Sequence, residues 1–215
     1  MSPVGIFGGT FDPIHYGHLR TAFEVLEVLG FAQIRFVPSG EPPHRDVTFA
    51  SAELRLQMVA AATASEPRFV VDNREIRRAG PSYTLDTLET MRREFSAVPM
   101  GLIIGMDAFL GLTTWHRWEE LLEYAHIIVA HRPGWRAPET GPLGGLYAKR
   151  STQRAEDLHE RPAGLIYVHA VTQLEISSTA IREMVGNGCD PRFLMPDAVR
   201  DLIHSTGCYE RVAPE

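Results

Sequence analysis

The chain has 215 residues, of which 44% are apolar and 22% charged, and its formal net charge is −6 at pH 7. This length and composition fit one domain with a sizeable core, so we predict a single domain over residues 1–215. Proteins that coat nucleic acid are usually basic, so the acidic balance argues against nucleic acid as a partner. It does not exclude one polyanionic small molecule in a locally positive pocket.

Cysteine usage and the N-terminal sequence indicate the compartment. Cys189 and Cys208 lie far apart and form no Cys-x-x-Cys pair, which favours free thiols in a reducing compartment. Met1 is followed by neither a basic segment nor a long apolar run, so we expect no signal peptide, no transmembrane segment and no membrane partner. The sequence therefore predicts a cytoplasmic protein.

Short apolar strands alternate with helical periodicity along the chain. Strands are expected in residues 4–7, 33–40, 68–73, 100–107, 126–134 and 164–170. A first helix is expected from about Tyr16 to Gly30, with an apolar face of Leu19, Ala22, Phe23, Leu26 and Leu29. The next is capped by Ser51 and has an apolar stripe of Leu54, Met58 and Ala62. Further helices are expected in residues 82–95, 117–125, 177–185 and 196–207.

This alternation predicts the fold class. About six strands separated by helices indicate an α/β fold, a Rossmann-like, doubly wound parallel sheet. A small helical part at residues 177–215 follows it. Residues 133–164 show no clear period and are rich in Gly and Pro, so we interpret them as a flexible surface insertion.

The junction after the first strand has the features of a phosphate site. Gly8, Gly9 and Thr10 follow the strand, and a helix begins near Tyr16. In open α/β sheets ligands bind beyond the carboxyl ends of the strands, and a helix start favours anions. The spacing matches neither a P-loop nor a dinucleotide fingerprint. We therefore expect backbone N–H groups here to bind phosphate.

Two histidines, His15 and His18, lie where that helix begins. Three residues apart, they can face the same side and donate N–H to phosphate oxygens, or become charged as negative charge develops. A pair of solvated or capping histidines is the plain alternative. A zinc site is a third interpretation, but the pattern supplies no third ligand.

A second helix start lies near the C-terminus. Ser177 and Ser178 are both good caps, and Arg182 is expected in the first turn, where the helix dipole disfavours a cation. An exposed arginine would tolerate this small cost, or an anion would offset it. Two helix starts, two histidines and an arginine on one ligand suggest a nucleoside triphosphate.

These segments resemble a known family. Residues 8–18, GGTFDPIHYGH, look like the G-T-F-D-P-x-H-x-G-H signature of the nucleotidyltransferase superfamily, and residues 176–182, ISSTAIR, look like its I-S-S-T-x-x-R motif. Over essentially the whole chain the match is best with the bacterial nicotinate-nucleotide adenylyltransferases. Four inner elements select this branch: Pro42-Pro43-His44, residues 82–88, Gly105-Met106-Asp107, and Trp115 with Trp118.

The resemblance implies adenylyl transfer from ATP to nicotinate mononucleotide, giving nicotinate adenine dinucleotide and pyrophosphate. It implies Mg²⁺ bound mainly through the ATP phosphates, with no metal ligand from protein side chains. His15, His18 and Arg182 would be catalytic. ATP would contact Gly8, Gly9, Thr10, Phe11, His15, His18, Gly105, Asp107, Ser177, Ser178, Thr179 and Arg182. The mononucleotide would contact Thr10, His44, Arg45, Ser82, Tyr83, Thr84, Trp115 and His116.

Two positions depart from the family pattern. Arg45 stands where lysine is usual, which keeps the charge but changes a point cation into a planar fork. His116 stands where an aromatic residue often follows the tryptophan. A contact through the backbone of His116 would be unaffected.

Other functions remain open at this point. The acceptor could be another phosphorylated compound such as nicotinamide mononucleotide, or the chain could be a non-catalytic nucleotide sensor. Pantetheine-phosphate adenylyltransferases and cytidylyltransferases are usually shorter and lack residues 82–84 and Trp115. Class I aminoacyl-tRNA synthetases need a lysine-rich motif, whereas Lys149 is the only lysine here. A homo-oligomer is also possible.

Overall fold

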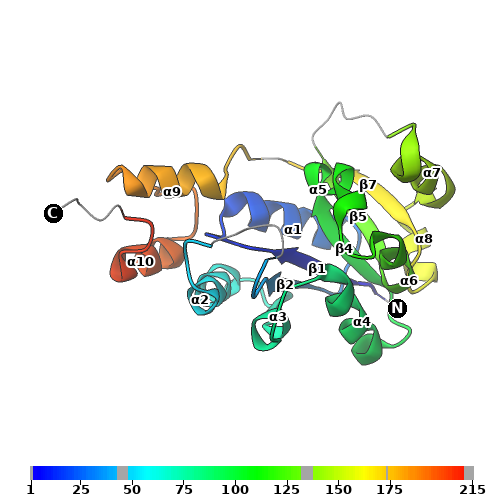
Figure 1. The fold of residues 1–215 in the computed structure, drawn as a ribbon, viewed down its shortest axis with the longest axis horizontal. Coiled ribbons are helices and arrows are strands. Elements are labelled where there is room, and N and C mark those ends of the chain that lie inside the picture. The colour runs from blue at the N-terminus through cyan, green and yellow to red at the C-terminus, as the bar shows by residue number, and fades with distance from the viewer. Residues whose placement is uncertain (1, 43–47, 132–137, 173, 211–215) are drawn as a thin grey trace.

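The structure is a computed structural model that describes residues 2–42, 48–131, 138–172 and 174–210. In these residues seven strands form one sheet in the order β3-β2-β1-β4-β5-β7-β6 (Figure 1), and all neighbouring pairs are parallel. The strands are β1 Val4–Gly9, β2 Gln33–Pro38, β3 Phe69–Val71, β4 Met100–Gly105, β5 His126–His131, β6 Ser151–Thr152 and β7 Ile166–Ala170. The predicted parallel α/β sheet is confirmed, with one strand more than expected because β6 is only two residues long.

Helices cover both faces of this sheet (Figure 1). They are α1 Tyr16–Val28, α2 Ala52–Thr63, α3 Arg74–Arg77, α4 Thr84–Phe95, α5 Met106–Leu110, α6 Leu121–Tyr124, α7 Gly141–Arg150, α8 Asp157–Glu160, α9 Ser178–Gly186 and α10 Asp197–Thr206. Two short 3₁₀ helices, Leu112–Thr114 and Trp118–Glu120, lie between α5 and α6. In the described part of the chain, no helix combines the length and apolar character needed to cross a membrane.

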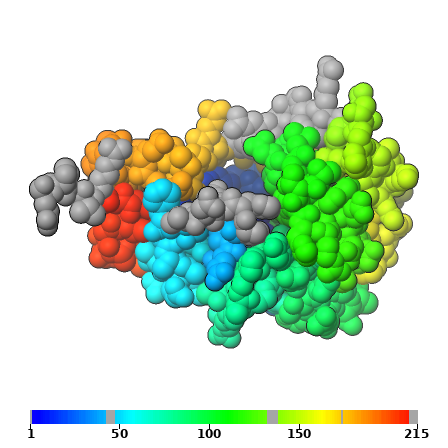
Figure 2. All heavy atoms as spheres, in the orientation of Figure 1, coloured from blue at the N-terminus to red at the C-terminus, as the bar shows by residue number. Residues whose placement is uncertain are grey.

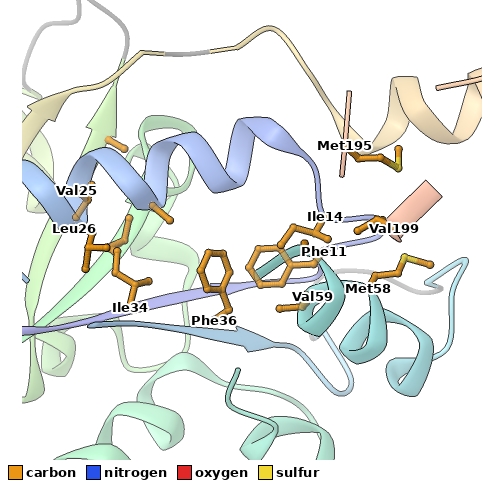
Figure 3. Close-up of a cluster of buried hydrophobic side chains, with 14 of the residues drawn as sticks. Phe11, Ile14, Val25, Leu26, Ile34, Phe36, Met58, Val59, Met195 and Val199 are labelled. Atoms are coloured by element: carbon orange, nitrogen blue, oxygen red, sulfur yellow. The ribbon is translucent and has the colours of Figure 1, made fainter. Parts of the chain in front are cut away.

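The core consists of two apolar clusters, one on each face. Along β4, Ile103 belongs to the cluster that α1, α2, α9 and α10 share, whereas Leu102 and Ile104 belong to the cluster of α4, α6 and α7. Successive strand side chains point to opposite faces, so an unbroken apolar strand is buried on both. Figure 3 shows the first cluster, in which Phe11 and Phe36 lie side by side.

Helix α1 packs on the sheet with a face slightly different from the predicted one. Ala22, Leu26 and Leu29 are buried as expected, and Val25 joins them with no exposed surface. Phe23 is 36% exposed, so its assignment to the buried face is wrong. Residue 25 lies between residues 22 and 29 on the helix surface, three and four positions away, and this places it at the centre of the contact.

Residues 138–164 contain regular structure that the sequence did not indicate. They include α7, β6 and α8, the strand β6 pairs with β7, and Leu143 and Leu158 are buried. A Cβ at Gly144 would lie 2.8 Å from the carbonyl carbon of Glu139, so this glycine permits close packing rather than marking a loop. The predicted flexible insertion therefore contains two helices and a short strand. Its mobility stays a prediction, and residues 133–137 lie outside the described residues.

Candidate functional site

Two cavities meet at the carboxyl ends of β1 and β4. Strand β1 pairs with β2 on one side and with β4 on the other, so the sheet order reverses there, as at the ligand sites of open α/β sheets. The cavities share Phe7, Gly8, Gly9 and Gly105. Figure 2 shows the surface hollowed between α9 and α5, where blue atoms of the N-terminal elements are visible.

The larger of the two, which we call the histidine cavity, has a volume of about 380 Å³. Seven of the residues predicted to contact ATP line it: Gly8, Gly9, Phe11, His15, His18, Gly105 and Asp107. The strand-to-helix junction after β1 and the end of β4, both predicted to contact ATP, therefore lie in the wall of one cavity.

The two histidine rings lie against each other in this wall. Their centroids are 3.8 Å apart with an angle of 28° between the planes. The backbone N–H of His15 donates to Nδ1 of His18 at 3.3 Å. Because Nδ1 accepts, a neutral His18 carries its proton on Nε2, the nitrogen that is then free to donate.

Burial decides the charge of both rings. It lowers the pKa of His15 to about 4, and burial together with the nearby His15 lowers the pKa of His18 well below its usual value. Both imidazoles are therefore neutral at neutral pH, and each offers one N–H. Of the two roles that the sequence left open, donation is the one that this geometry favours.

The lowered pKa of His15 makes stability depend on pH. Between pH 6.5 and 4 His15 binds a proton in the unfolded chain but not in the folded protein. The contribution of neutral His15 to the unfolding free energy is therefore complete above pH 6.5 and is lost as the pH falls toward 4. Over that window the unfolding free energy of the wild type should fall by about 3 kcal/mol more than that of His15→Asn. Urea denaturation at several pH values measures it. The exposed His204→Asn is the control, and parallel curves for wild type and His15→Asn would contradict the prediction.

The glycines at the ends of β1 and β4 serve two different purposes. A Cβ at Gly9 would lie 3.1 Å from the ring of Phe11, which is buried with a backbone φ of +50°. A Cβ at Gly8 or Gly105 would meet nothing within 4 Å. Gly9 is therefore needed by the protein's own packing, while Gly8 and Gly105 leave open space where the two cavities join.

Gly17 supports the position of His15. A Cβ here would lie 2.9 Å from Nδ1 of His15, a separation that forces the ring to shift. Gly17→Ala should therefore lower turnover although alanine favours a helix by about 1 kcal/mol. The matched control is Gly145→Ala in α7, where a Cβ meets nothing within 4 Å. Equal, unchanged turnover in both variants would contradict this role for Gly17.

The second motif holds the start of α9 against the loop before α1. Ser177 Oγ accepts from the N–H of Ala180 at 3.1 Å, and this confirms the predicted cap. Ser178 Oγ donates to the carbonyl of Pro13 at 2.9 Å. Both hydroxyls thus have protein partners, and their contact with ATP stays a prediction.

Arg182 belongs to the same contact and lies outside the wall of the histidine cavity. Its guanidinium donates to the carbonyl of Asp12 at 2.7 Å and to Thr179 Oγ1 at 3.1 Å, and lies 4.5 Å from the ring centroid of Phe49. These bonds connect it to the loop that leads into His15. The contact of Arg182 with a triphosphate stays a prediction.

The smaller cavity, which we call the tryptophan cavity, has a volume of about 250 Å³. Among the residues predicted to contact the mononucleotide, those in its wall are Thr10, Ser82, Thr84 and Trp115. Tyr83 and His116 stack on each other instead, with centroids 4.4 Å apart. His44 and Arg45 lie outside the described residues.

Comparison with known proteins agrees with the geometry. Residues 6–184 match the cytidylyltransferase-like family model. Proteins from Aeromonas hydrophila and Acidithiobacillus ferrooxidans, each named as a probable nicotinate-nucleotide adenylyltransferase, are 46% and 45% identical to this chain. The alignments cover 96% and 95% of this chain, and 97% and 94% of those proteins. The chain belongs to the nicotinate-nucleotide adenylyltransferase family.

A solved structure shares the fold of this adenylyltransferase. The Plasmodium falciparum nicotinic acid mononucleotide adenylyltransferase complexed with NaAD superposes with a TM-score of 0.74, covering 97% of this chain and 98% of that one. Its sequence is 16% identical, so the likeness concerns the fold. The predicted family and enzyme class are confirmed by the relatives of nearly full length.

Asp12, in the loop that leads into His15, connects distant segments of the chain, although the sequence analysis did not single it out. It is 1% exposed, and its carboxylate accepts from the N–H groups of Phe49 and Ala50 at 2.9 and 3.1 Å and from the Tyr209 hydroxyl at 2.7 Å. Burial and the Asp12 charge raise the pKa of Tyr209 well above its usual value. The sequence did contain a signal for this residue, because Asp12 lies inside the first motif, residues 8–18.

Arg55 was also missed. It is fully buried in α2 and donates to the carbonyl of Thr10 at 2.7 Å and of Gly40 at 3.1 Å. These bonds fix the turns after β1 and β2, which carry residues of both cavities. The signal was an arginine three positions before the buried Met58, on the apolar side of a helix.

Proposed function

We propose that this protein transfers the adenylyl group of ATP to nicotinate mononucleotide, forming nicotinate adenine dinucleotide and pyrophosphate. The observation that carries the proposal is the meeting of two cavities at Gly8, Gly9 and Gly105, with His15 and His18 in the wall of one. ATP would occupy the histidine cavity and the mononucleotide the tryptophan cavity. The two reacting phosphates would then approach each other at the shared glycines.

The chemistry needs positioning and charge neutralisation rather than covalent help. An oxygen of the mononucleotide phosphate attacks the α-phosphorus in line, a P–O bond forms, and the P–O bond to pyrophosphate breaks. His15 and His18 donate N–H to the phosphate oxygens as neutral imidazoles, and Arg182 adds a positive charge. Gly105 and Asp107, at the end of β4, would contact the ribose of ATP.

We propose that Mg²⁺ is bound mainly through the ATP phosphates. In the described part of the chain, no group of three or more His, Cys, Asp or Glu side chains could hold a metal ion. Mg²⁺ commonly keeps several waters and binds mainly through substrate phosphates, so it needs no protein cage here. When bound, the ion would neutralise charge on the phosphate oxygens. Asp107 contributes a carboxylate to the wall of the same cavity.

Pyrophosphate release with ATP and nicotinate mononucleotide, together with chromatography of the dinucleotide product, tests the proposal. If pyrophosphate is released only with another mononucleotide, the protein is an adenylyltransferase with a different acceptor. If ATP binds but no acceptor leads to pyrophosphate release, a nucleotide sensor is favoured. The proposal includes a cytoplasmic location and leaves a homo-oligomer possible.

A further inference from the structure

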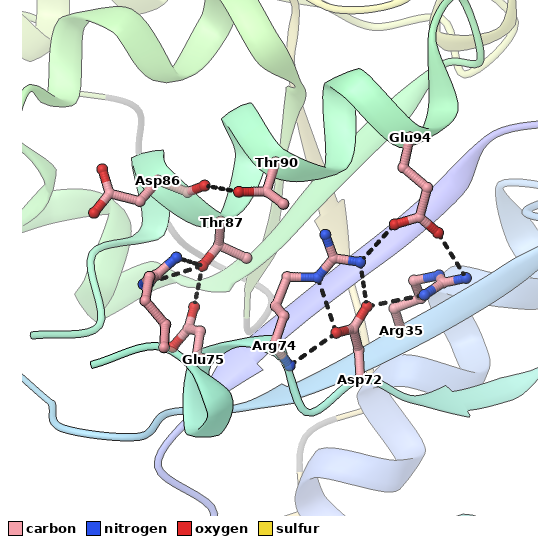
Figure 4. Close-up of polar contacts among 9 residues, drawn as sticks. Arg35, Asp72, Arg74, Glu75, Asp86, Thr87, Thr90 and Glu94 are labelled. Carbon is pink, nitrogen blue, oxygen red and sulfur yellow. Dashed lines mark hydrogen bonds and ion pairs between the residues drawn. The ribbon is translucent and has the colours of Figure 1, made fainter. Parts of the chain in front are cut away.

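A buried carboxyl group in the tryptophan cavity has no part in the chemistry above. Glu75, in the short helix α3, is 7% exposed and lines this cavity. The Thr87 hydroxyl donates to its Oε1 at 2.6 Å (Figure 4). Glu75 is therefore joined to the second turn of α4, the helix whose start lies in the same wall.

Ser82 provides a second connection. Its Oγ accepts from the N–H of Gly40 at 2.9 Å and of Glu41 at 3.3 Å, and its own N–H donates to the carbonyl of Glu41 at 2.8 Å. Because Oγ accepts twice, the Ser82 hydroxyl hydrogen is left to donate, and we infer that its acceptor is the buried Glu75 carboxyl in the wall of the same cavity. One carboxyl thus orients hydroxyls on both sides of the start of α4.

The network is closely packed as well as bonded. A Cβ at Gly40 would lie 2.5 Å from the carbonyl oxygen of Glu75, so the turn after β2 lies directly on α3. Arg78 donates to Thr87 Oγ1 at 3.3 Å. Burial raises the pKa of Glu75, and the Thr87 bond, the Arg78 charge and the Ser82 bond oppose that rise. A buried polar network is stable only when its members are paired, so loss of one partner disturbs the rest.

We propose that Glu75 is a positioning residue for the acceptor mononucleotide. Through Ser82 it holds the turn at Gly40, Glu41 and Pro42 against the start of α4, and Pro42 lines the tryptophan cavity with Ser82 and Thr84. The inference rests on the proposed function, which puts the acceptor in this cavity. Glu75 does not line the histidine cavity, so its effect should concern the mononucleotide and not ATP.

The discriminating variant is Glu75→Gln. The glutamine has the same shape, but its NH₂ would face either the Ser82 oxygen, which already accepts twice, or the donating Thr87 hydroxyl. Loss of one oriented buried hydrogen bond should raise the Kd and KM for the mononucleotide about tenfold and leave those for ATP within about twofold. Isothermal titration calorimetry gives both Kd values, and steady-state pyrophosphate release gives both KM values.

A double-mutant cycle with Ser82→Ala tests the route. If Glu75 acts through Ser82, Glu75→Gln should change the mononucleotide Kd little when Ser82 is already alanine. The control is Asp72→Asn: Asp72 pairs with Arg35 and Arg74 at 2.9 and 2.7 Å in the neighbouring network of Figure 4 and lines neither cavity. It should lower the melting temperature without changing the ratio of the two Kd values.

Three results separate the possible failures. Equal changes in both Kd values for Glu75→Gln, or fully additive effects in the cycle, would overturn the positioning role. A wild type that binds both nucleotides but releases no pyrophosphate would overturn the proposed function alone, since the Kd split is still measurable. A wild type that does not bind the mononucleotide would overturn both.

Discussion

Replacing His18 with asparagine is expected to lower kcat about 100-fold, a loss of about 2.7 kcal/mol of transition-state stabilisation, while the fold remains intact. The Nδ1 of His18 accepts from the His15 N–H, so the donor that can reach a phosphate is Nε2–H. Asparagine can place an oxygen near the Nδ1 position and keep the internal bond, but its side chain ends before Nε2. The variant therefore removes the donor and little else.

Glutamine at the same position is the matched control. Its amide NH₂ extends to about where Nε2 lies, so His18→Gln should recover part of the lost turnover, whereas His18→Ala should recover none. Pyrophosphate release measures kcat, and a thermal melt shows whether each variant is folded. A folded His18→Asn protein with most of the wild-type turnover would remove His18 from the catalytic residues.

The parts of the fold and site that sequence reasoning located depend on local patterns. Strand β4 was recognisable because an unbroken apolar run fits a strand with both faces covered, and the structure buries Met100–Ile104. The junction at residues 8–18 was recognisable because its glycines, histidines and helix start are adjacent in the chain. Parallel strands then bring the ends of β1 and β4 together without any further signal.

The parts that it did not locate depend on contacts between distant segments. Arg182 donates to the carbonyl of Asp12, 170 positions earlier, and no periodicity in α9 reports that bond. Glu75 looks like an ordinary surface charge in the sequence, and the apolar position of Arg55 does not reveal its partners, because the groups that these side chains bind belong to other elements. Gly144 reads as a loop residue until its close packing against Glu139 is seen.

The second large effect is substrate selectivity: kcat/KM for nicotinate mononucleotide should exceed that for nicotinamide mononucleotide by about 100-fold or more. Helix α4 begins at Thr84, and the first N–H groups of a helix have no carbonyl partner within it. The N–H of Ser82 is bonded to Glu41 and that of Tyr83 to Pro81, so the donors available in this wall begin with Thr84. A carboxylate accepts from such donors with both oxygens, whereas a carboxamide directs its own NH₂ at one of them.

Trp115 and Glu75 restrict where the pyridine ring of the mononucleotide can lie in the tryptophan cavity. Trp115 lies in the wall of the same cavity, where its indole can stack on the ring and hold the substituted edge in place. The Glu75 carboxyl lies in the same wall and already accepts from the Thr87 hydroxyl, so the acid group finds its donors at the Thr84 end of the cavity. At the start of α4 the acid therefore pairs with the helix N–H donors through both oxygens, whereas the amide places its NH₂ against one of them.

Thr84→Pro tests this contact directly. Proline is tolerated at the first position of a helix, and Tyr83, with φ −86° and ψ 132°, already has the extended backbone that precedes proline. The variant removes the Thr84 N–H, so it should lower kcat/KM for the acid about tenfold or more and change that for the amide much less. Thr84→Ala, which keeps the N–H, should keep the preference. Comparable efficiencies of the wild-type enzyme with the two mononucleotides would leave adenylyl transfer in place and rule out selectivity at this helix start.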